Sequence, residues 1–256
     1  MKILVLVKAV PHTSGGYDET QKKTELIPNP ADMTALEEAL VLREETGAEV
    51  TVMTMGVPGC ESILRQTIAC GADRAVLLTD RAFAGADTAA TSRTIAAAIS
   101  HLGGFDLIFC GRKSTDGETG QVGPELATRL GIGCVTGCIS FMLTEEGAEC
   151  RCITDTGTAR YQGRLPMVVC FCNGINSPRL QSLSGLFRAK RAEIPVLDRV
   201  KLGLAAESCG QKGSPTVVSA STRCSFEKRN PRRFGEDSLT EAVAFALEAG
   251  KVVRHG

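Results

Sequence analysis

The 256-residue chain lacks a net charge and any long apolar run. Its 29 basic residues balance 29 acidic residues, so no overall field favours a nucleic acid or an anionic membrane. The apolar run that follows Lys2 covers only residues 3–7, which is too short for the core of a signal peptide or for a membrane span. We therefore expect a cytoplasmic protein that neither inserts into a membrane nor binds nucleic acid.

Histidine is scarce and the cysteines lack a metal-binding spacing. The chain has three histidines and 11 cysteines, with no Cys-x-x-Cys motif, and the odd cysteine count favours reduced thiols. The pairs Cys150/Cys152 and Cys170/Cys172 have the two-residue period of a strand. A metal site would need four thiolates from two strands, and free cysteine more often packs as a small apolar residue. We predict no metal site and leave the role of the paired cysteines open.

A catalytic constellation is also missing. Asp32, Asp73, Asp87 and Asp116 fit helix caps or turns, and none has a second carboxylate or a histidine at a suggestive spacing. His12 follows the first apolar run, where a solvated loop residue is the more common role. We predict no catalytic residue.

The first half of the chain alternates short apolar runs with helical patterns. The runs cover residues 3–7, 49–55, 75–78 and 105–110. Helices are expected from a Thr34/Glu37 capping box, over residues 61–70 ahead of Gly71, and after Asp87. This alternation predicts an α/β fold with a Rossmann-like parallel sheet flanked by helices.

The second half of the chain has a different pattern. Over residues 138–172, strand-like segments are separated by turn residues, which predicts an antiparallel hairpin extension of the sheet. A last helix is expected over residues 239–249, with Ser238 as its cap and Gly250 as its end. We predict a nucleotide-binding domain over residues 1–190 and a C-terminal arm over residues 191–256, packed on a partner.

A glycine-rich segment follows the fourth apolar run. Over residues 111–123, Gly111, Gly117 and Gly120 allow close backbone approach and positive φ angles, and a helix beginning near Thr119 would direct free N–H groups at an anion. The segment has neither a GxxxxGK[ST] nor a GxGxxG motif, so an ordinary loop between strand and helix remains an alternative. Two further loops, "VKAVPHTSGG" and "RAFAGADTAATS", are expected at the same sheet edge.

Several ordered blocks together resemble one family. They are "ILVLVKAVP", "IPNPADMTALEEAL", "TMG", "GADRAVLLTDRAFAGADT", "GRKSTDGETGQVGPELA" and "NSPRLQSL", from Met1 to about Leu204, and the tail "GQKGSPTVV" is also similar. The chain thus resembles the β subunit of electron transfer flavoprotein. The resemblance implies a Rossmann-like subunit that pairs with a flavin-carrying α subunit as a heterodimer and transfers electrons.

The resemblance also implies a nucleotide site and a docking loop. Together with the loops described above, the predicted cofactor-binding residues are Leu6, Lys8, Pro11, Asn29, Pro30, Ala31, Asp32, Met55, Gly56, Gly85, Ala86, Asp87, Thr88, Gly111, Arg112, Lys113, Ser114, Thr115, Asp116, Gly117, Glu118, Thr119, Gly120, Gln121 and Val122. In the segment "PRLQSLSGLFRAKR", the family's anchoring leucine falls on Leu183, with Arg179 and Arg188 beside it. These three residues are the predicted contacts with a partner, an acyl-CoA dehydrogenase or a related enzyme.

The family has two kinds of β subunit, and the choice decides the cofactor. The housekeeping kind holds AMP, whereas the electron-bifurcating kind holds FAD and takes electrons from NADH for a low-potential acceptor such as ferredoxin. The block "DRAFAGADTAATS" is similar to the bifurcating kind, so we favour FAD. The alternatives are a housekeeping subunit with AMP and a non-redox adenine-nucleotide sensor.

The chain departs from the family pattern at four positions. They are His12, Arg112, Lys113 and Ala159, where Asp, Lys, Gln and an acidic residue are more usual. The extra positive charge favours a diphosphate and puts the flavin potentials in doubt.

Overall fold

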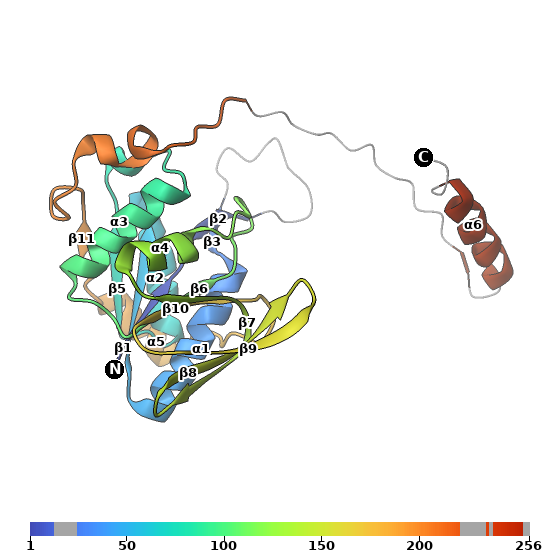
Figure 1. The fold of residues 1–256 in the computed structure, drawn as a ribbon, viewed down its shortest axis with the longest axis horizontal. Helices are drawn as coiled ribbons and strands as arrows, with labels where there is room; N and C mark the ends of the chain where they lie inside the picture. Colours follow the sequence, from blue (N-terminus) through green and yellow to red (C-terminus); the bar gives the residue numbers. More distant parts are fainter. Residues whose placement is uncertain (13–24, 221–233, 236–237, 253–256) are drawn as a thin grey trace. The chain divides into compact units, whose positions relative to one another are not determined.

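The computed structural model describes residues 1–12, 25–220, 234–235 and 238–252 (Figure 1). The chain forms two compact units, Met1–Val217 and Val218–Gly256. The predicted division at residue 190 concerns function, and it stays a prediction. None of the helices in the described part has the length and apolarity that crossing a membrane requires.

A nine-stranded sheet forms the centre of the first unit. Its strand order is β11-β5-β4-β1-β6-β10-β7-β8-β9, and every pairing from β11 to β7 is parallel. The bounds are β1 Lys2–Leu6, β4 Glu49–Met55, β5 Arg74–Leu78, β6 Leu107–Gly111, β7 Gly133–Thr144, β8 Gly147–Thr154, β9 Gly157–Gly163, β10 Met167–Phe171 and β11 Val196–Leu197. A separate antiparallel ribbon pairs β2 (Ala9–Pro11) with β3 (Leu26–Pro28).

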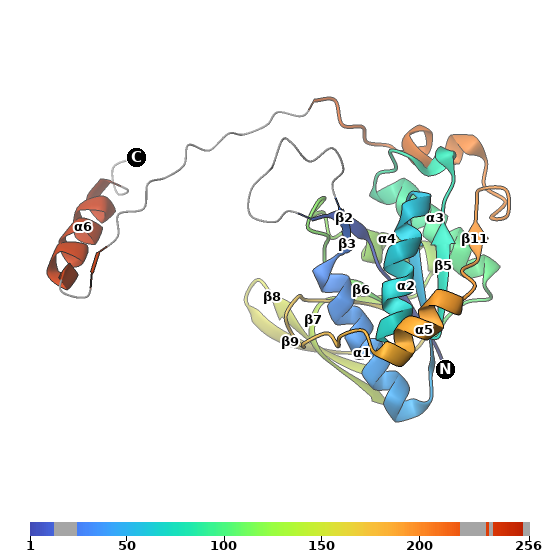
Figure 2. The same cartoon turned by 180° about the vertical axis from the view of Figure 1, so that it is seen from behind.

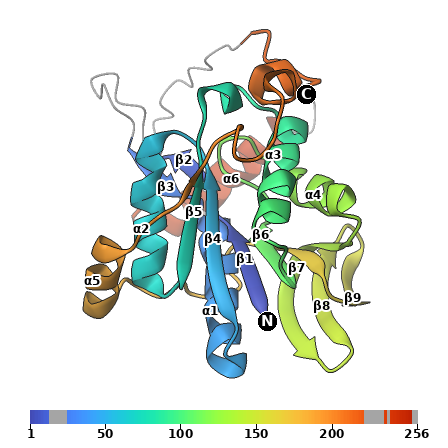
Figure 3. The same ribbon diagram turned by 90° about the vertical axis from the view of Figure 1, so that its left-hand side faces the viewer.

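Helices cover both faces of the sheet, as Figures 2 and 3 show. Helices α1 (Pro30–Thr46), α2 (Glu61–Cys70) and α5 (Leu183–Arg191) pack with one apolar cluster of the sheet, and α3 (Thr88–His101) and α4 (Val122–Leu130) pack with the other. The chain passes from β1 through β4 to β5 on one side of β1, and then crosses to β6 on the other side. The predicted α/β class is thus confirmed. The reversal of strand order beside β1 is the place where such sheets bind ligands.

Local signals explain most helix ends. Asp87 begins α3, since its Oδ1 accepts the Ala90 N–H at 2.9 Å, and Gly47 ends α1 with φ 71°. The predicted capping box at Thr34 is wrong. Pro30 supplies the fixed φ of the first helical position, so α1 begins at Pro30, with Asn29 in place of Thr34 at the cap position, and the Thr34 hydroxyl instead donates to the Pro30 carbonyl at 3.3 Å.

The predicted hairpin extension is present. Strand β8 pairs antiparallel with both β7 and β9, whereas β10, which the antiparallel prediction also covered, lies between β6 and β7 as a parallel strand. In the second unit, α6 extends over Leu239–Val252. Gly250 therefore does not end that helix as predicted, because an isolated glycine costs a helix only about 1 kcal/mol.

Candidate functional site

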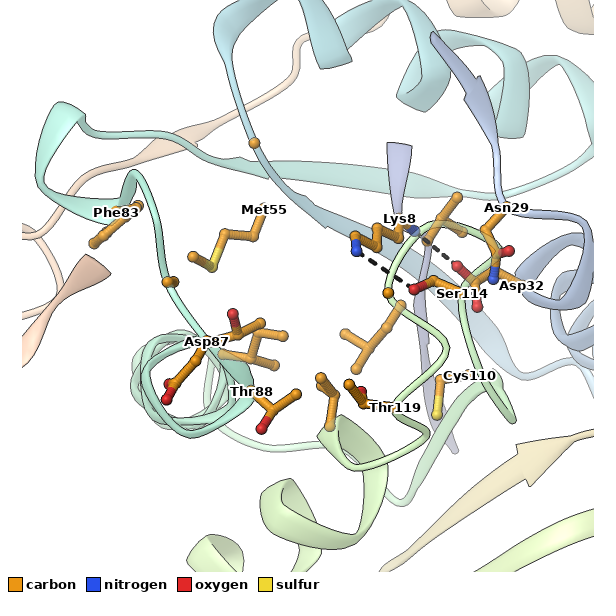
Figure 4. Close-up of a pocket in the computed structure, with 18 of the residues that line it drawn as sticks. Lys8, Asn29, Asp32, Met55, Phe83, Asp87, Thr88, Cys110, Ser114 and Thr119 are labelled. Atoms are coloured by element: carbon orange, nitrogen blue, oxygen red, sulfur yellow. Dashed lines mark hydrogen bonds between the residues drawn. The ribbon is translucent and has the colours of Figure 1, made fainter. Parts of the chain in front are cut away.

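A cavity of about 1160 Å³ opens at the carboxyl ends of β1, β4, β5 and β6. Figure 4 shows side chains from separate loops converging on it. One wall comes from the segment after β6, residues 111–123, which we call the cradle. The opposite wall comes from residues 81–88, between β5 and α3, which we call the shelf. Ligand pockets usually span about 300–1,000 Å³, so this cavity admits a ligand longer than a typical small molecule.

The carboxylate of Asp32 joins three elements beneath the cavity. Its Oδ2 accepts the Lys8 N–H and its Oδ1 accepts the Gly111 N–H, both at 2.8 Å, so the first turn of α1 is bound to the ends of β1 and β6. A Cβ at Gly111 would lie 2.6 Å from both Ala31 Cβ and Asp32 Oδ1. Burial raises the pKa of Asp32 to about 6, although the two backbone donors oppose that rise. A glycine at 111 is required for this close approach.

Asn29 connects the start of α1 to the cradle. Its backbone N–H donates to the Lys8 carbonyl at 2.9 Å. Its side chain does not cap α1: Nδ2 donates to the Lys113 carbonyl at 3.2 Å, and Oδ1 accepts the Thr115 N–H at 3.3 Å. Asn29 and Asp32 therefore hold the cradle in place from below.

Positive charge and free N–H groups face the cavity from the cradle. Lys8 Nζ contacts Asp116 Oδ1 at 2.7 Å. It also donates to Ser114 Oγ at 3.4 Å, as Figure 4 shows. Arg112 is exposed at the cavity edge, and within the described chain its guanidinium makes no hydrogen bond or ion pair. Helix α4 begins after Gln121 with no side-chain cap, so its first N–H groups remain available to an anion.

The predicted glycines of the cradle differ in backbone conformation. Gly120 has φ +64°, and a Cβ there would lie 3.1 Å from the Arg112 carbonyl oxygen. Gly117 is not in the left-handed region, and a Cβ there would make only ordinary contacts. The prediction of positive φ at Gly111 and Gly117 is therefore wrong, since only Gly120 among the three adopts it.

The shelf combines small residues with an apolar base. Gly85 and Ala86 line the cavity together with Phe83 and Met55, and Figure 4 shows the Met55 side chain on the side of the cavity nearer to Phe83 and Asp87. Thr88 joins the shelf to α4, because its hydroxyl donates to Glu125 Oε1 at 2.8 Å. Desolvation opposes ionisation of Asp87, but donors from Ala90 and Thr216 keep the pKa of Asp87 below its ordinary value. Asp87 therefore remains a carboxylate at neutral pH.

Most predicted site residues meet at this cavity. Those that line it are Leu6, Lys8, Asn29, Asp32, Met55, Gly56, Gly85, Ala86, Asp87, Thr88, Gly111, Arg112, Lys113, Ser114, Gly117, Thr119, Gly120, Gln121 and Val122. Those outside the lining are Pro11, Pro30, Ala31, Thr115, Asp116 and Glu118. Pro11 belongs to β2, and Asp116 contacts the lining through Lys8 Nζ at 2.7 Å and through the Gly117 N–H, which its Oδ1 accepts at 2.8 Å. Ligand binding by any of these residues stays a prediction.

A further group of residues lines the base and rim of the cavity but is not among the predicted site residues, although Val7, Arg81, Phe83, Ala84, Thr91 and Gly123 lie in segments that were expected at this edge. The whole group is Val7, Met53, Val57, Pro58, Thr79, Asp80, Arg81, Phe83, Ala84, Thr91, Ile95, Cys110, Gly123 and Thr216. The apolar members read as core in a sequence. Thr216 lies 128 residues beyond Thr88 in the chain, and no local pattern indicates that both face one cavity.

The predicted docking residues have different environments. Leu183 begins α5 and is 78% exposed, together with the exposed Leu180 and Phe187. Arg179 instead pairs with Glu37 at 2.9 Å and with Glu44, and Arg188 donates to the Ile68 carbonyl at 2.7 Å. Both guanidinium groups thus bind this chain itself, and Leu183 remains available to a partner.

The cysteines of the described residues are free thiols, and in that part no group of three or more His, Cys, Asp and Glu side chains is placed to hold a metal ion. Cys150 and Cys152 are buried in the core near Cys138. Cys110 and Cys170 lie on neighbouring strands with their sulfur atoms 3.5 Å apart. Gly123 makes room for this pair, because a Cβ there would lie 2.4 Å from Cys170 Sγ.

Comparison with known proteins identifies the family. The electron transfer flavoprotein domain matches residues 19–202. The chain is 41% identical to the electron transfer flavoprotein subunit beta of Clostridium acetobutylicum, over 96% of each chain. It is 39% identical to subunit CarD of the caffeyl-CoA reductase-Etf complex of Acetobacterium woodii, over 99% of this chain and 97% of CarD. It is also 39% identical to the acryloyl-CoA reductase electron transfer subunit gamma of Anaerotignum propionicum, over 85% of this chain and 86% of that subunit.

The doubly wound sheet, the cavity at its strand ends and these matches lead to one assignment. The chain belongs to the electron transfer flavoprotein family, among its β subunits, and serves in electron transfer.

Proposed function

We propose that the cavity binds FAD and that the chain, in a heterodimer with an electron transfer flavoprotein α subunit, accepts electrons from NADH. Electrons then pass through the α-subunit flavin, to or from an acyl-CoA or related dehydrogenase and a low-potential acceptor such as ferredoxin. FAD would supply the exchange between a hydride and single electrons, and the residues of this chain bind and orient it.

The observation that carries the proposal is the extent of the cavity. It reaches from the cradle, past Lys8 and Met55, to the shelf at Gly85–Thr88. An adenosine monophosphate at the cradle would leave the apolar part around Phe83 unfilled, whereas a dinucleotide with a flat ring fills both parts. The small side chains at Gly85 and Ala86 leave room for such a ring.

The cradle matches a diphosphate in charge and geometry. Arg112 lines the cavity without an ion pair among the described residues, whereas Lys113, which also lines it, pairs with Glu118 at 3.3 Å. Gly120 brings the backbone close, and the uncapped start of α4 offers N–H donors. Arg81, at the shelf, adds a further cation at the rim and is a candidate contact for the phosphates of NADH.

Two relatives support a complex with a CoA-ester reductase. CarD is named as part of a caffeyl-CoA reductase-Etf complex, and the Anaerotignum propionicum protein as an electron transfer subunit of acryloyl-CoA reductase. In this chain the exposed residues of α5 and the preceding loop, Leu180, Leu183 and Phe187, would contact the dehydrogenase. An adenine-nucleotide sensor without redox chemistry is disfavoured by the family assignment.

The test is a count of flavins in the purified α/β complex. Two FAD per heterodimer are expected, together with reduction of the bound flavin by NADH. One FAD and one AMP would refute the proposal and would assign the chain to the housekeeping kind.

Ala86→Phe distinguishes the two parts of the cavity. The added ring occupies the shelf, and a packed pocket tolerates extra volume poorly, so the complex should keep the α-subunit flavin and lose the second FAD. Ala86 is preferred to Gly85, because Gly85 has φ +71° and a Cβ there would lie 3.1 Å from Gln211 Cβ. A phenylalanine at 85 would therefore strain the backbone whatever the ligand. If the Ala86→Phe complex retains both flavins, the flavin ring does not bind at the shelf.

A further inference from the structure

Asp87 binds a distant segment as well as beginning α3. Its Oδ2 accepts the Thr216 N–H at 3.0 Å and the Thr216 hydroxyl at 2.8 Å, while Oδ1 holds the first turn of the helix. Its backbone N–H donates to Ser214 Oγ at 2.9 Å. We call residues 209–216 the strap. Asp87 thus lies between the strap and the helix that borders the cavity.

The strap supports the shelf along its length. Gln211 donates its N–H to the Ala84 carbonyl at 2.9 Å, and the buried Cys209 packs with Phe83 in one apolar cluster. At Gly210 a Cβ would lie 2.1 Å from the Ala82 carbonyl oxygen, so the two backbones are in direct contact. Movement of the strap would therefore move the shelf.

Arg93 holds the strap against α3. Its Nη1 donates to the carbonyl of Ser208, the residue just before the strap, at 2.7 Å and to the carbonyl of Gly213, within the strap, at 3.1 Å. Within the strap, Ser214 Oγ donates to the Gly210 carbonyl at 2.7 Å. Thr216 is the strap residue that lines the cavity, whereas neither Arg93 nor Ser214 lines it. These two side chains can be changed without removing a group that faces the ligand.

The cradle is held by a different set of contacts. Asn29 and Asp32 fix it from α1, and neither contacts the strap. The shelf touches the cradle side through Thr88, which donates to Gln121 and Glu125. Because Asn29 and Asp32 hold residues 111–115 from the start of α1, a loosened strap should displace the shelf and leave this part of the cradle in place.

We propose that the strap is a latch that sets ligand specificity, because it holds the shelf where a ligand longer than a mononucleotide makes its second contact. Arg93, Ser214 and Asp87 are positioning residues in this device. The identity of the longer ligand, FAD, rests on the proposed function. A mononucleotide that contacts the cradle alone is insensitive to the latch.

The experiment compares Arg93→Met and Ser214→Ala with the control Arg43→Met, in the α/β complex. Arg43 forms hydrogen bonds of 2.7–3.0 Å with Asp73, at the ends of the strands opposite to the cavity. Arg43→Met therefore removes an arginine and its hydrogen bonds, as Arg93→Met does, but at a place away from the cavity. FAD and AMP are each titrated into complex from which the second ligand has been removed. We expect roughly tenfold weaker FAD binding for Arg93→Met, because two hydrogen bonds from a charged donor are lost, with AMP binding changed by about twofold or less. The control should alter neither.

Hydrogen exchange of the same proteins is an independent measurement. In the two latch variants, amides of residues 82–88 and of residues 209–216 should exchange faster together, while the control matches the wild type. Faster exchange confined to the strap would overturn the latch, as would equal weakening of FAD and AMP binding. If the wild-type complex binds AMP and no FAD, the proposed function fails, and the exchange data alone decide whether strap and shelf move together. Ser214→Ala removes a single hydroxyl, so it keeps the test decisive if Arg93→Met unfolds.

Discussion

At the residue scale, burial of Asp32 beneath the cavity opposes the ionisation of its carboxyl group. Its carboxyl is buried, and it holds the Lys8 and Gly111 N–H groups with one oxygen each. Burial raises its pKa to about 6 from an ordinary 3.8. Between pH 3.8 and about pH 6, Asp32 therefore keeps its proton in the folded chain and has released it in the unfolded chain.

This shift predicts a pH dependence of stability. Because the pKa of Asp32 is higher in the folded chain, the protonated carboxyl contributes its full share of the free energy of unfolding below about pH 4. This contribution, up to about 3 kcal/mol, is lost as the pH rises through 6. Asp32→Asn cannot titrate, although its amide turns one acceptor into a donor. Urea unfolding of both proteins from pH 4.5 to 7 should show the wild type losing stability relative to the variant. A difference that stays constant with pH would show that Asp32 does not titrate in this range.

The two cradle glycines give a matched pair. Gly120→Ala places a Cβ 3.1 Å from the Arg112 carbonyl at φ +64°, which costs about 1–3 kcal/mol, so the variant should lose its nucleotide on purification. Gly117→Ala introduces a Cβ with ordinary contacts and should keep it. The nucleotide released by denaturing each complex is quantified by chromatography. If the two variants contain equal amounts of nucleotide, Gly120 is not required for nucleotide binding.

At the scale of the element, α5 is a short helix fixed to α2. Gly185 allows the approach, because a Cβ there would lie 2.1 Å from the Ala69 carbonyl oxygen. Arg188 donates to the carbonyls of the buried residues Ile68 and Ala72 at the end of α2. Its outer surface presents Leu183 and Phe187. The same helix thus has one set of residues for attachment and another for contact with a partner.

The two roles predict different mutant phenotypes. Leu183→Ala should weaken dehydrogenase coupling roughly thirtyfold, since truncating an interface anchor costs about 2 kcal/mol, and should leave thermal stability unchanged. Arg188→Ala should lower the free energy of unfolding by about 1–3 kcal/mol because it leaves buried carbonyls without their donor. Electron transfer assays and thermal unfolding of both variants provide the measurements. An unstable Leu183→Ala protein would contradict its assignment to the outer surface.

At the scale of the whole molecule, the first unit contains both apolar clusters and the cavity. All the buried residues of the two clusters, and Thr216 at the rim, lie within Met1–Val217. In the second unit, α6 presents exposed apolar side chains, including Leu239, Val243 and Leu247. Such a stripe is typical of a helix that a partner covers.

A truncated chain of residues 1–219 tests this division. It should fold with a melting temperature near that of the full chain and keep its nucleotide, because no member of either cluster is removed. Its affinity for the α subunit should fall, because the apolar stripe of α6 is lost. Thermal unfolding, nucleotide content and co-purification with the α subunit separate these effects. Undiminished pairing would exclude residues 220–256 from the heterodimer interface.

The sequence alone determined the features that depend on local patterns. Alternating apolar runs predicted the parallel strands, Asp87 and Gly71 marked helix ends, and the glycine-rich segment after β6 marked the cradle, because hydrophobic period and backbone permissiveness act over a few residues. The beginning of α1 was missed, since the Thr34/Glu37 spacing competed with the equally local signal of Pro30.

Only the tertiary structure decided which distant residues share a task. The apolar base around Phe83 reads as ordinary core, and the contact of Asp87 with Thr216 spans 129 residues. Arg179 and Arg188 read as exposed charge, yet folding brings them to Glu37 and to the end of α2. Such contacts arise from packing between elements, and the free energy that selects them depends on the whole chain, so no window of sequence contains it.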